Sequence, residues 1–237
     1  MPEKSRTMTI TEHIEELRKR LLISLVFLAI TTAISFSFAQ YVIEYLSQPI
    51  GGLENLQSIE ITENVGVFMR VSLLSGFILA LPVILYEMLA FIMPGLEPGE
   101  KRWVYWTIPF ITIMFIVGAA FAFLVMLPAA IPFLTSFLGV QTVPRLSNYV
   151  KFVTNLFFWI GISFQAPIVV FILARLKLVN ASGLIKQWRL AVVIIAILAA
   201  MVTPTVDPVN MALLMAPLIL LYFISVLLAA LARRGEK

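Results

Sequence analysis

Long apolar stretches alternate with short polar ones along the whole chain. A helix needs about 20 apolar residues to cross the roughly 30 Å of hydrocarbon in a bilayer, and the pattern predicts six such helices. Their predicted ranges are 21–41, 67–92, 104–127, 150–174, 190–203 and 209–232. The fifth is short: at about 1.5 Å per residue it covers only some 20 Å, so it must thin the bilayer or rely on its neighbours. We therefore expect an all-α, polytopic membrane protein.

Four prolines lie inside these predicted helices, at positions 82, 109, 167 and 217. Each removes one helical hydrogen bond and is expected to bend its helix, so a curved, concave bundle follows. The chain is 61% hydrophobic and only 13% charged, whereas a soluble domain has about 25% charged residues. No polar block is long enough for a separate soluble domain. Residues 1–237 are therefore predicted to form a single integral membrane domain.

The basic residues are distributed unevenly between the two sides of the predicted membrane. Of the 17 Lys and Arg residues, 14 fall in the two terminal tails and in the loops after the second and fourth predicted helices, which share one side. The positive-inside rule makes that side cytoplasmic and places both termini there. The other side has only Arg70, Arg145 and Lys151. The net charge of +4 reflects this bias and contact with anionic headgroups, so no nucleic-acid partner is expected.

Two acidic positions stand out on the side that is otherwise basic. Glu16 lies four residues before Arg20 on a predicted helix, a spacing that gives ordinary surface salt bridges of roughly 0.2–0.5 kcal/mol. Glu100 falls in the first turn of the third predicted span, where a carboxylate complements the helix dipole. Both positions thus have a structural explanation. The alternative is that these carboxylates face a cationic partner.

Two further polar residues have both a structural and a functional interpretation. Gln165 is a strongly polar side chain deep inside a predicted span. A buried amide in lipid usually bonds another helix, but intramembrane polar residues are also candidates for contact with a partner or substrate. Asp207 lies between two prolines in the third outer turn, where it fits either a turn or helix-cap residue or a functional acidic group.

Several kinds of chemistry are excluded by what the chain lacks. It has no cysteine, which excludes disulfides and thiolate chemistry, and its single histidine is His13 in the polar N-terminal stretch. It has no phosphate-binding glycine loop and no pair of histidines for a metal. A serine-protease elbow is also missing. We therefore expect neither an enzyme nor a bound cofactor or metal.

Several motifs, taken together, resemble those of one family. The segments 13–22, 47–49, 82–94, 100–102 and 161–167, together with Thr203-Pro204 and Asp207, resemble TatC, the signal-peptide receptor of the twin-arginine protein translocase. They occur in the family's order and cover essentially the whole chain. The resemblance implies six membrane spans, in agreement with the apolar pattern.

The resemblance also implies which residues bind the signal peptide. Glu16 and Arg18 match the N-terminal signal-binding segment, and Phe91 and Glu100 match its partner in the first cytoplasmic loop. Guanidinium groups pair with carboxylates through a planar two-pronged contact that an ammonium group cannot copy. Glu16 and Glu100 are therefore expected to select two adjacent arginines on a rim whose other charges repel generic cationic peptides.

Three more positions follow from the same resemblance. Pro49 matches a functionally sensitive proline of the first outer loop, and Asp207 matches the acidic residue of the third. Gln165 falls where many family members have Glu. A glutamine keeps the ability to hydrogen-bond but cannot load and release a proton, so a mechanism that needs a membrane carboxylate is not expected in this chain.

The function implied is that of a receptor and assembly core for the export of folded proteins across the bacterial inner membrane, driven by the proton gradient. Six helices cannot enclose a pore wide enough for folded cargo, so TatA- and TatB-type single-span proteins and further copies of the chain are expected partners. Gln165 and the fifth and sixth spans are the expected docking surfaces. A small-solute secondary transporter is the main alternative, although the chain shows no inverted repeat. An intramembrane hydrolase would lack its nucleophile and base.

Overall fold

The computed structural model describes residues 10–92, 98–136, 142–203 and 208–234. Nearly all of these residues are helical, and the extended pairing among them is one parallel bridge between Gln57 and Arg145. The α-helices, in chain order, are α1 (Ile10–Ser35), α2 (Ala39–Ser47), α3 (Glu63–Ile92), α4 (Pro98–Phe121), α5 (Leu127–Ser136), α6 (Leu146–Ser163), α7 (Ala166–Arg175), α8 (Ala181–Lys186), α9 (Trp188–Val202) and α10 (Pro208–Arg234).

Four helical runs in the described part of the chain are long and apolar enough to cross a membrane. They are Glu63–Phe91, Ile108–Ser136, Leu146–Arg175 and Met211–Ala232. A fifth is counted if α1 and α2, which are bent by 74° relative to each other, form one broken span. Helix α9 is apolar but has only 15 residues. The protein is therefore a nearly all-helical, multi-pass membrane protein.

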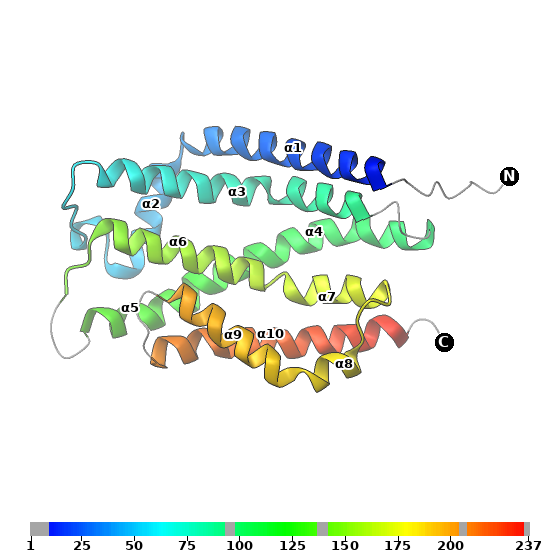
Figure 1. Ribbon diagram of the computed structural model, residues 1–237. Coiled ribbons are helices and arrows are strands. Elements are labelled where there is room, and N and C mark those ends of the chain that lie inside the picture. The colour runs from blue at the N-terminus through cyan, green and yellow to red at the C-terminus, as the bar shows by residue number, and fades with distance from the viewer. Residues whose placement is uncertain (1–9, 93–97, 137–141, 204–207, 235–237) are drawn as a thin grey trace.

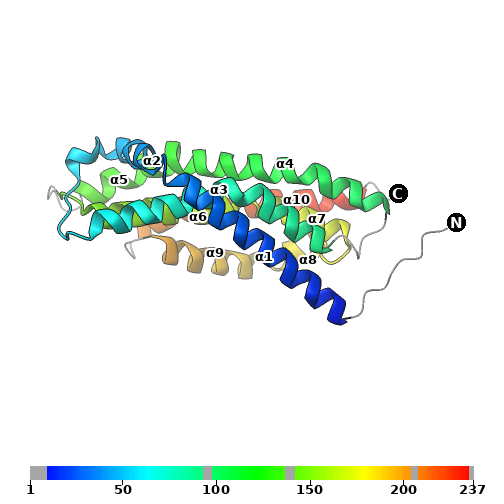
Figure 2. The same ribbon diagram turned by 90° about the horizontal axis from the view of Figure 1, so that it is seen from above.

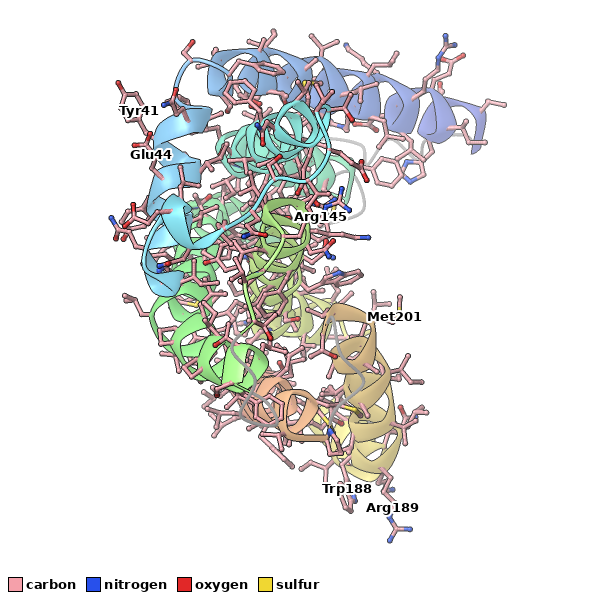
Figure 3. The ribbon with its side chains drawn as sticks, turned by 90° about the vertical axis from the view of Figure 1, so that its left-hand side faces the viewer. Tyr41, Glu44, Arg145, Trp188, Arg189 and Met201 are labelled. Carbon is pink, nitrogen blue, oxygen red and sulfur yellow. The ribbon has the colours of Figure 1, made fainter. Side chains whose placement is uncertain are left out.

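The helices lie lengthwise beside one another, and α1 begins at the same end of the bundle at which α10 ends (Figure 1). We call this the terminal end and the opposite one the far end. Helix α1 crosses the bundle obliquely (Figure 2). Seen along the bundle, the helices follow an arc whose hollow side lies between α1 and α9, with α6 between them (Figure 3). The expected concavity is therefore present.

The prolines inside the helices differ in what they do. Helices α3, α4 and α10 continue through Pro82, Pro109 and Pro217, respectively. Before Pro167 the helix breaks: α6 ends at Ser163 and α7 begins at Ala166. Proline has no backbone N–H to bond the preceding turn, and it is tolerated in the first turn of a helix, where no such bond is made. A second irregularity, a π-helical turn over Ala122–Met126, joins α4 to α5. Both irregularities allow the long apolar runs to follow the arc.

Small residues allow α1 and α3 to approach closely. A methyl group at Gly76 would lie 2.5 Å from the Cα atom of Thr32, and Thr31 donates its hydroxyl hydrogen to the Gly76 carbonyl at 2.8 Å. Close backbone contact and hydrogen bonds of this kind are what hold helices together in lipid, where no hydrophobic drive exists between them. This pairing fixes the position of α1, which carries part of the candidate site.

The core lies between α3, α4, α6 and α10. Val71, Leu127, Leu156 and Leu214 are fully buried in its largest cluster. A smaller cluster nearer the terminal end centres on the buried ring of Phe115, against which Gly161 leaves no room for a side chain. Large apolar side chains on the outside of α1, α9 and α10 are exposed, as expected for surfaces that face lipid.

Candidate functional site

A three-residue charged cluster joins α1 to α3 at the terminal end of the bundle. Arg20 donates from Nε to Glu16 Oε1 at 3.0 Å, and its Nη2 group bonds the same oxygen. Its Nη1 group donates to Glu87 Oε2 at 3.0 Å. One guanidinium therefore bridges two carboxylates that lie 71 residues apart in the sequence. We call these residues the inner cluster.

The inner cluster is mostly shielded from solvent but is not fully satisfied. The exposed fraction of the side chain is 17% for Glu16 and 11% for Glu87. Glu16 Oε2 is buried and has no hydrogen-bond partner among the described residues. A buried carboxylate oxygen normally has a donor, since leaving one without a partner is costly. Glu16 Oε2 is therefore available to accept a hydrogen bond from one more donor, neutral or cationic.

An aromatic contact lies one helical turn away from this cluster. The rings of His13 on α1 and Phe91 on α3 are stacked, with centroids 4.2 Å apart and an interplanar angle of 22°. Because His13 is three residues before Glu16, the two share one face of α1. The structure therefore brings together Glu16 and Phe91, which the sequence analysis singled out in separate segments.

The other two residues predicted to bind the signal peptide are placed differently. Arg18 is exposed and lies about 200° around α1 from Glu16, so it does not join the inner cluster. Glu100 lies in the first turn of α4, which begins at Pro98. The position predicted from the sequence is therefore correct for its backbone, and its side chain lies outside the described part of the structure.

Glu87 belongs to the cluster but was not singled out from the sequence. It lies inside the second predicted span and four residues before Phe91, so a helix places both on one face. An acidic residue within a membrane span marks a functional site by default. Its position inside a predicted membrane span therefore already indicates that Glu87 is a candidate functional residue.

Gln165 is buried at the break between α6 and α7. Its Nε2 group donates to the Gly161 carbonyl at 3.3 Å, and its Oε1 atom is buried without a partner among the described residues. The expected structural role was a hydrogen bond to a neighbouring helix. The amide instead bonds its own chain segment.

Of the two outer-loop candidates, the structure describes Pro49, which lies away from the inner cluster. Pro49 sits in a short 3-10 turn, Gln48–Ile50, at the far end. It lines a cavity of about 630 Å³ whose other walls include Asn55 and Pro132. Asp207 falls outside the described residues. The structure therefore places Pro49 apart from the signal-binding candidates.

Comparisons with known proteins identify the family. The family model described as Sec-independent protein translocase protein (TatC) matches residues 12–217. The chain is 34% identical over 236 residues to the TatC protein of Carboxydothermus hydrogenoformans, covering 98% of this chain and 97% of that one. It is 37% identical over 239 residues to the TatC protein of Aquifex aeolicus, covering 97% and 98%.

The fold agrees with these sequence matches. A crystal structure of the twin-arginine translocase receptor TatC superposes with a TM-score of 0.84 at 35% identity, covering 93% of this chain and 99% of that one. The chain belongs to the TatC family. Membership makes it a core subunit of a twin-arginine translocase. TatC proteins are components of a protein translocase, so protein translocation, and not the small-solute transport considered as an alternative, is the activity to be explained.

Proposed function

We propose that the chain crosses the bacterial inner membrane six times, with both termini in the cytoplasm. Support comes from the concentration of 14 of the 17 basic residues on one side of the predicted spans. It also comes from the arrangement of the bundle, in which α1 begins and α10 ends at the same end (Figure 1). In this orientation the inner cluster lies at the cytoplasmic surface, where a signal peptide arrives first.

We further propose that this surface binds the two arginines of a twin-arginine signal. The observation that carries the proposal is the buried Oε2 atom of Glu16, which has no hydrogen-bond partner among the described residues and lies beside a guanidinium that the chain itself supplies. Arg20 demonstrates the chemistry: its planar group bonds Glu16 and Glu87 together. The guanidinium of one signal arginine would donate a hydrogen bond to Glu16 Oε2, and the second arginine would pair with Glu100.

The remaining candidate residues shape the selection. Phe91 offers an aromatic ring on which a guanidinium or an apolar signal residue can stack. Arg18, exposed on the opposite face of α1, repels peptides that carry only scattered positive charge. The apolar segment of the signal would then lie along the hollow side of the bundle.

Assembly with partners completes the proposal. We infer that single-span proteins of the TatA and TatB type dock on α9, α10 and the region of Gln165, whose Oε1 atom lacks a donor in the described part of the chain. Further copies of the chain join the complex, and Pro49 and Asp207 act at its outer surface. The proton gradient supplies the energy, through groups other than a carboxylate at position 165.

Site-specific photocrosslinking from position 91 tests the signal site, because an aromatic probe there replaces an aromatic side chain and leaves Glu16 and Glu100 in place. A signal peptide with Arg-Arg should crosslink at least about tenfold more than one with Lys-Lys, since a hydrogen bond to a charged group contributes roughly 1.5–3 kcal/mol. With the probe kept at position 91, Glu16→Gln combined with Glu100→Gln should abolish the preference. Glu15→Gln is the matched control, because Glu15 is exposed on the same helix. Equal crosslinking of both peptides to the probe-bearing chain that keeps Glu16 and Glu100 would refute the proposal.

A further inference from the structure

The three basic residues that the charge pattern separates from the other fourteen come together in space. Arg70 lies on α3, Arg145 is the N-cap residue of α6, and Lys151 lies on α6. All three line one cavity of about 320 Å³ near the far end of the bundle. The sequence gives no hint of this, since the first two positions are 75 residues apart. We call this cavity the basic pocket.

The charges in the basic pocket are only partly neutralised. Arg145 pairs with Glu60 at 2.7 Å and with Glu63 at 2.9 Å. Arg70 bonds neutral oxygens instead: its Nε and Nη2 groups donate to Thr154 Oγ1 and Asn155 Oδ1, each at 2.7 Å. Within the described ranges, no carboxylate lies within ion-pair distance of Arg70 or Lys151.

An uncompensated guanidinium inside a membrane bundle is costly and usually has a functional partner. Arg70 is seven residues from the start of α3 at Glu63, or about 10 Å along the helix. Lys151 is five residues from the start of α6, or about 7 Å. Both cations therefore lie near the depth at which a bilayer's polar headgroup region meets its hydrocarbon core.

The surface around the pocket is polar toward the far end and apolar toward the middle of the bundle. The outward stripe of α6 begins with Asn148, Lys151 and Asn155 and continues with Phe158 and Ile162. A second cavity of about 380 Å³ lies on the other side of Lys151 and reaches Met201 and Thr203 at the end of α9. Arg145 and Met201 lie on the hollow side of the arc (Figure 3).

Exposed apolar side chains continue the surface on both flanks. Met69 and Leu73 lie within one turn of Arg70 on α3, and Ile197 and Met201 lie on α9. The surface thus combines two unpaired cations and amide donors at headgroup depth with apolar walls below them. A phospholipid is complementary to this surface, since it has an anionic phosphate in the headgroup and apolar acyl chains below it.

We propose that the basic pocket binds the phosphate group of an anionic phospholipid, with the acyl chains lying along the exposed faces of α3 and α9. Arg70 and Lys151 hold the phosphate oxygens, and Asn155, which accepts from Arg70 in the absence of lipid, turns its amide donors to them. A lipid fits better than a partner's acidic side chain because the apolar walls continue directly from the cations. The proposal is independent of the signal site and of which leaflet the far end occupies.

Native mass spectrometry of the full-length chain tests this site, with phosphatidylglycerol or phosphatidylcholine added to the detergent. The wild-type chain should retain phosphatidylglycerol at least about fivefold more than phosphatidylcholine, the change expected from about 1 kcal/mol per basic residue near a membrane surface. Arg70→Gln and Lys151→Gln should each lower the retention of phosphatidylglycerol by a similar factor. Glutamine at position 70 has an amide nitrogen where arginine has Nε, so it keeps a donor for Thr154 Oγ1, which protects the fold.

Lys186→Gln is the matched control, because Lys186 is an exposed lysine on α8, remote from the pocket. It should retain phosphatidylglycerol as the wild-type chain does. Equal retention of the two lipids, or no loss in either pocket variant, would overturn the proposal. Saturable binding of inorganic phosphate without lipid retention would show a simple anion site and also overturn it. So would photocrosslinking from the exposed position 201 beside the pocket, in native membranes, that yields a partner polypeptide and no lipid.

Discussion

Two clusters in this protein have the same composition, two glutamates and one arginine, and differ in how completely their hydrogen bonds are made. The inner cluster is Glu16, Arg20 and Glu87. At the far end, Glu60, Glu63 and Arg145 form what we call the outer latch. Glu63 Oε2 accepts from Arg145 Nε and from the backbone N–H groups of residues 59 and 60, and its Oε1 atom accepts from the N–H group of Ser147.

The outer latch is therefore closed by the chain itself. Both oxygens of Glu63 have donors, the side chain is 1% exposed, and the carboxylate joins the start of α3 to the start of α6. Hydrogen bonds to Glu60 and Glu63 raise the pKa of Arg145, so its positive charge is retained at any physiological pH. In the inner cluster, by contrast, the part of the chain that the structure describes offers no donor to Glu16 Oε2.

This difference separates a structural cluster from a binding cluster. A buried charge whose partners all come from the chain contributes to holding the fold, and removing it leaves its donors unpaired. A buried carboxylate with one oxygen that accepts no hydrogen bond can still bind a donor from another molecule. Ion-pair counts alone would have treated the two clusters as equivalent, whereas the completeness of hydrogen bonding distinguishes them.

The largest effect is expected when Glu63 is changed to Gln. The substitution removes the charge opposite Arg145 and replaces an acceptor oxygen with an amide donor that faces other donors. We expect the apparent melting temperature in detergent to fall by several degrees and the yield of folded protein to drop sharply, as measured by fluorescence-detected gel filtration. A variant as stable as the wild-type chain would remove the distinction between the two clusters.

The second effect concerns binding. Glu16→Gln should weaken the affinity for a synthetic twin-arginine peptide by about tenfold or more, since one charge-assisted contact of roughly 1.5–3 kcal/mol is lost. The melting temperature should change less than in Glu63→Gln, because Arg20 keeps its bond to Glu87. Fluorescence anisotropy of a labelled peptide measures the affinity, with Glu15→Gln as the control. Unchanged affinity would contradict the assignment.

A third pair of variants exchanges each arginine for lysine. An ammonium group cannot reproduce the planar fork that reaches two carboxylates at once. Arg145→Lys should lower the melting temperature more than Arg20→Lys does, because the outer latch joins two helix starts while α1 and α3 are also held together along their length. The opposite order of melting temperatures would show that the inner cluster is the more structural of the two.

The smallest effect is expected for Glu60→Gln. Glu60 pairs with Arg145, but its side chain is 64% exposed, and exposed ion pairs contribute little. The melting temperature should stay within measurement error of the wild-type value. A clear fall would mean that the latch depends on its exposed member as much as on Glu63.

The sequence predicted the parts of this protein that depend on the solvent and on short helical spacings. Apolar runs of membrane length predict helices wherever backbone groups cannot meet water, and the longer observed helices overlap those runs, whereas α2, α5 and α8 lie mostly or wholly outside them. The short α9 and the break at Pro167 also follow from length and from the missing proline donor. The contact between Glu16 and Arg20 follows from their spacing on one helix, and the family was identified by its motifs.

What only the tertiary structure decided is which distant side chains meet. Arg20 reaches Glu87, His13 stacks on Phe91, and Arg70, Arg145 and Lys151 share one pocket. Helical spacing fixes neighbours only within about one turn. Contacts between helices depend instead on close approaches such as that of Gly76 to Thr32, which set the register of one helix against another.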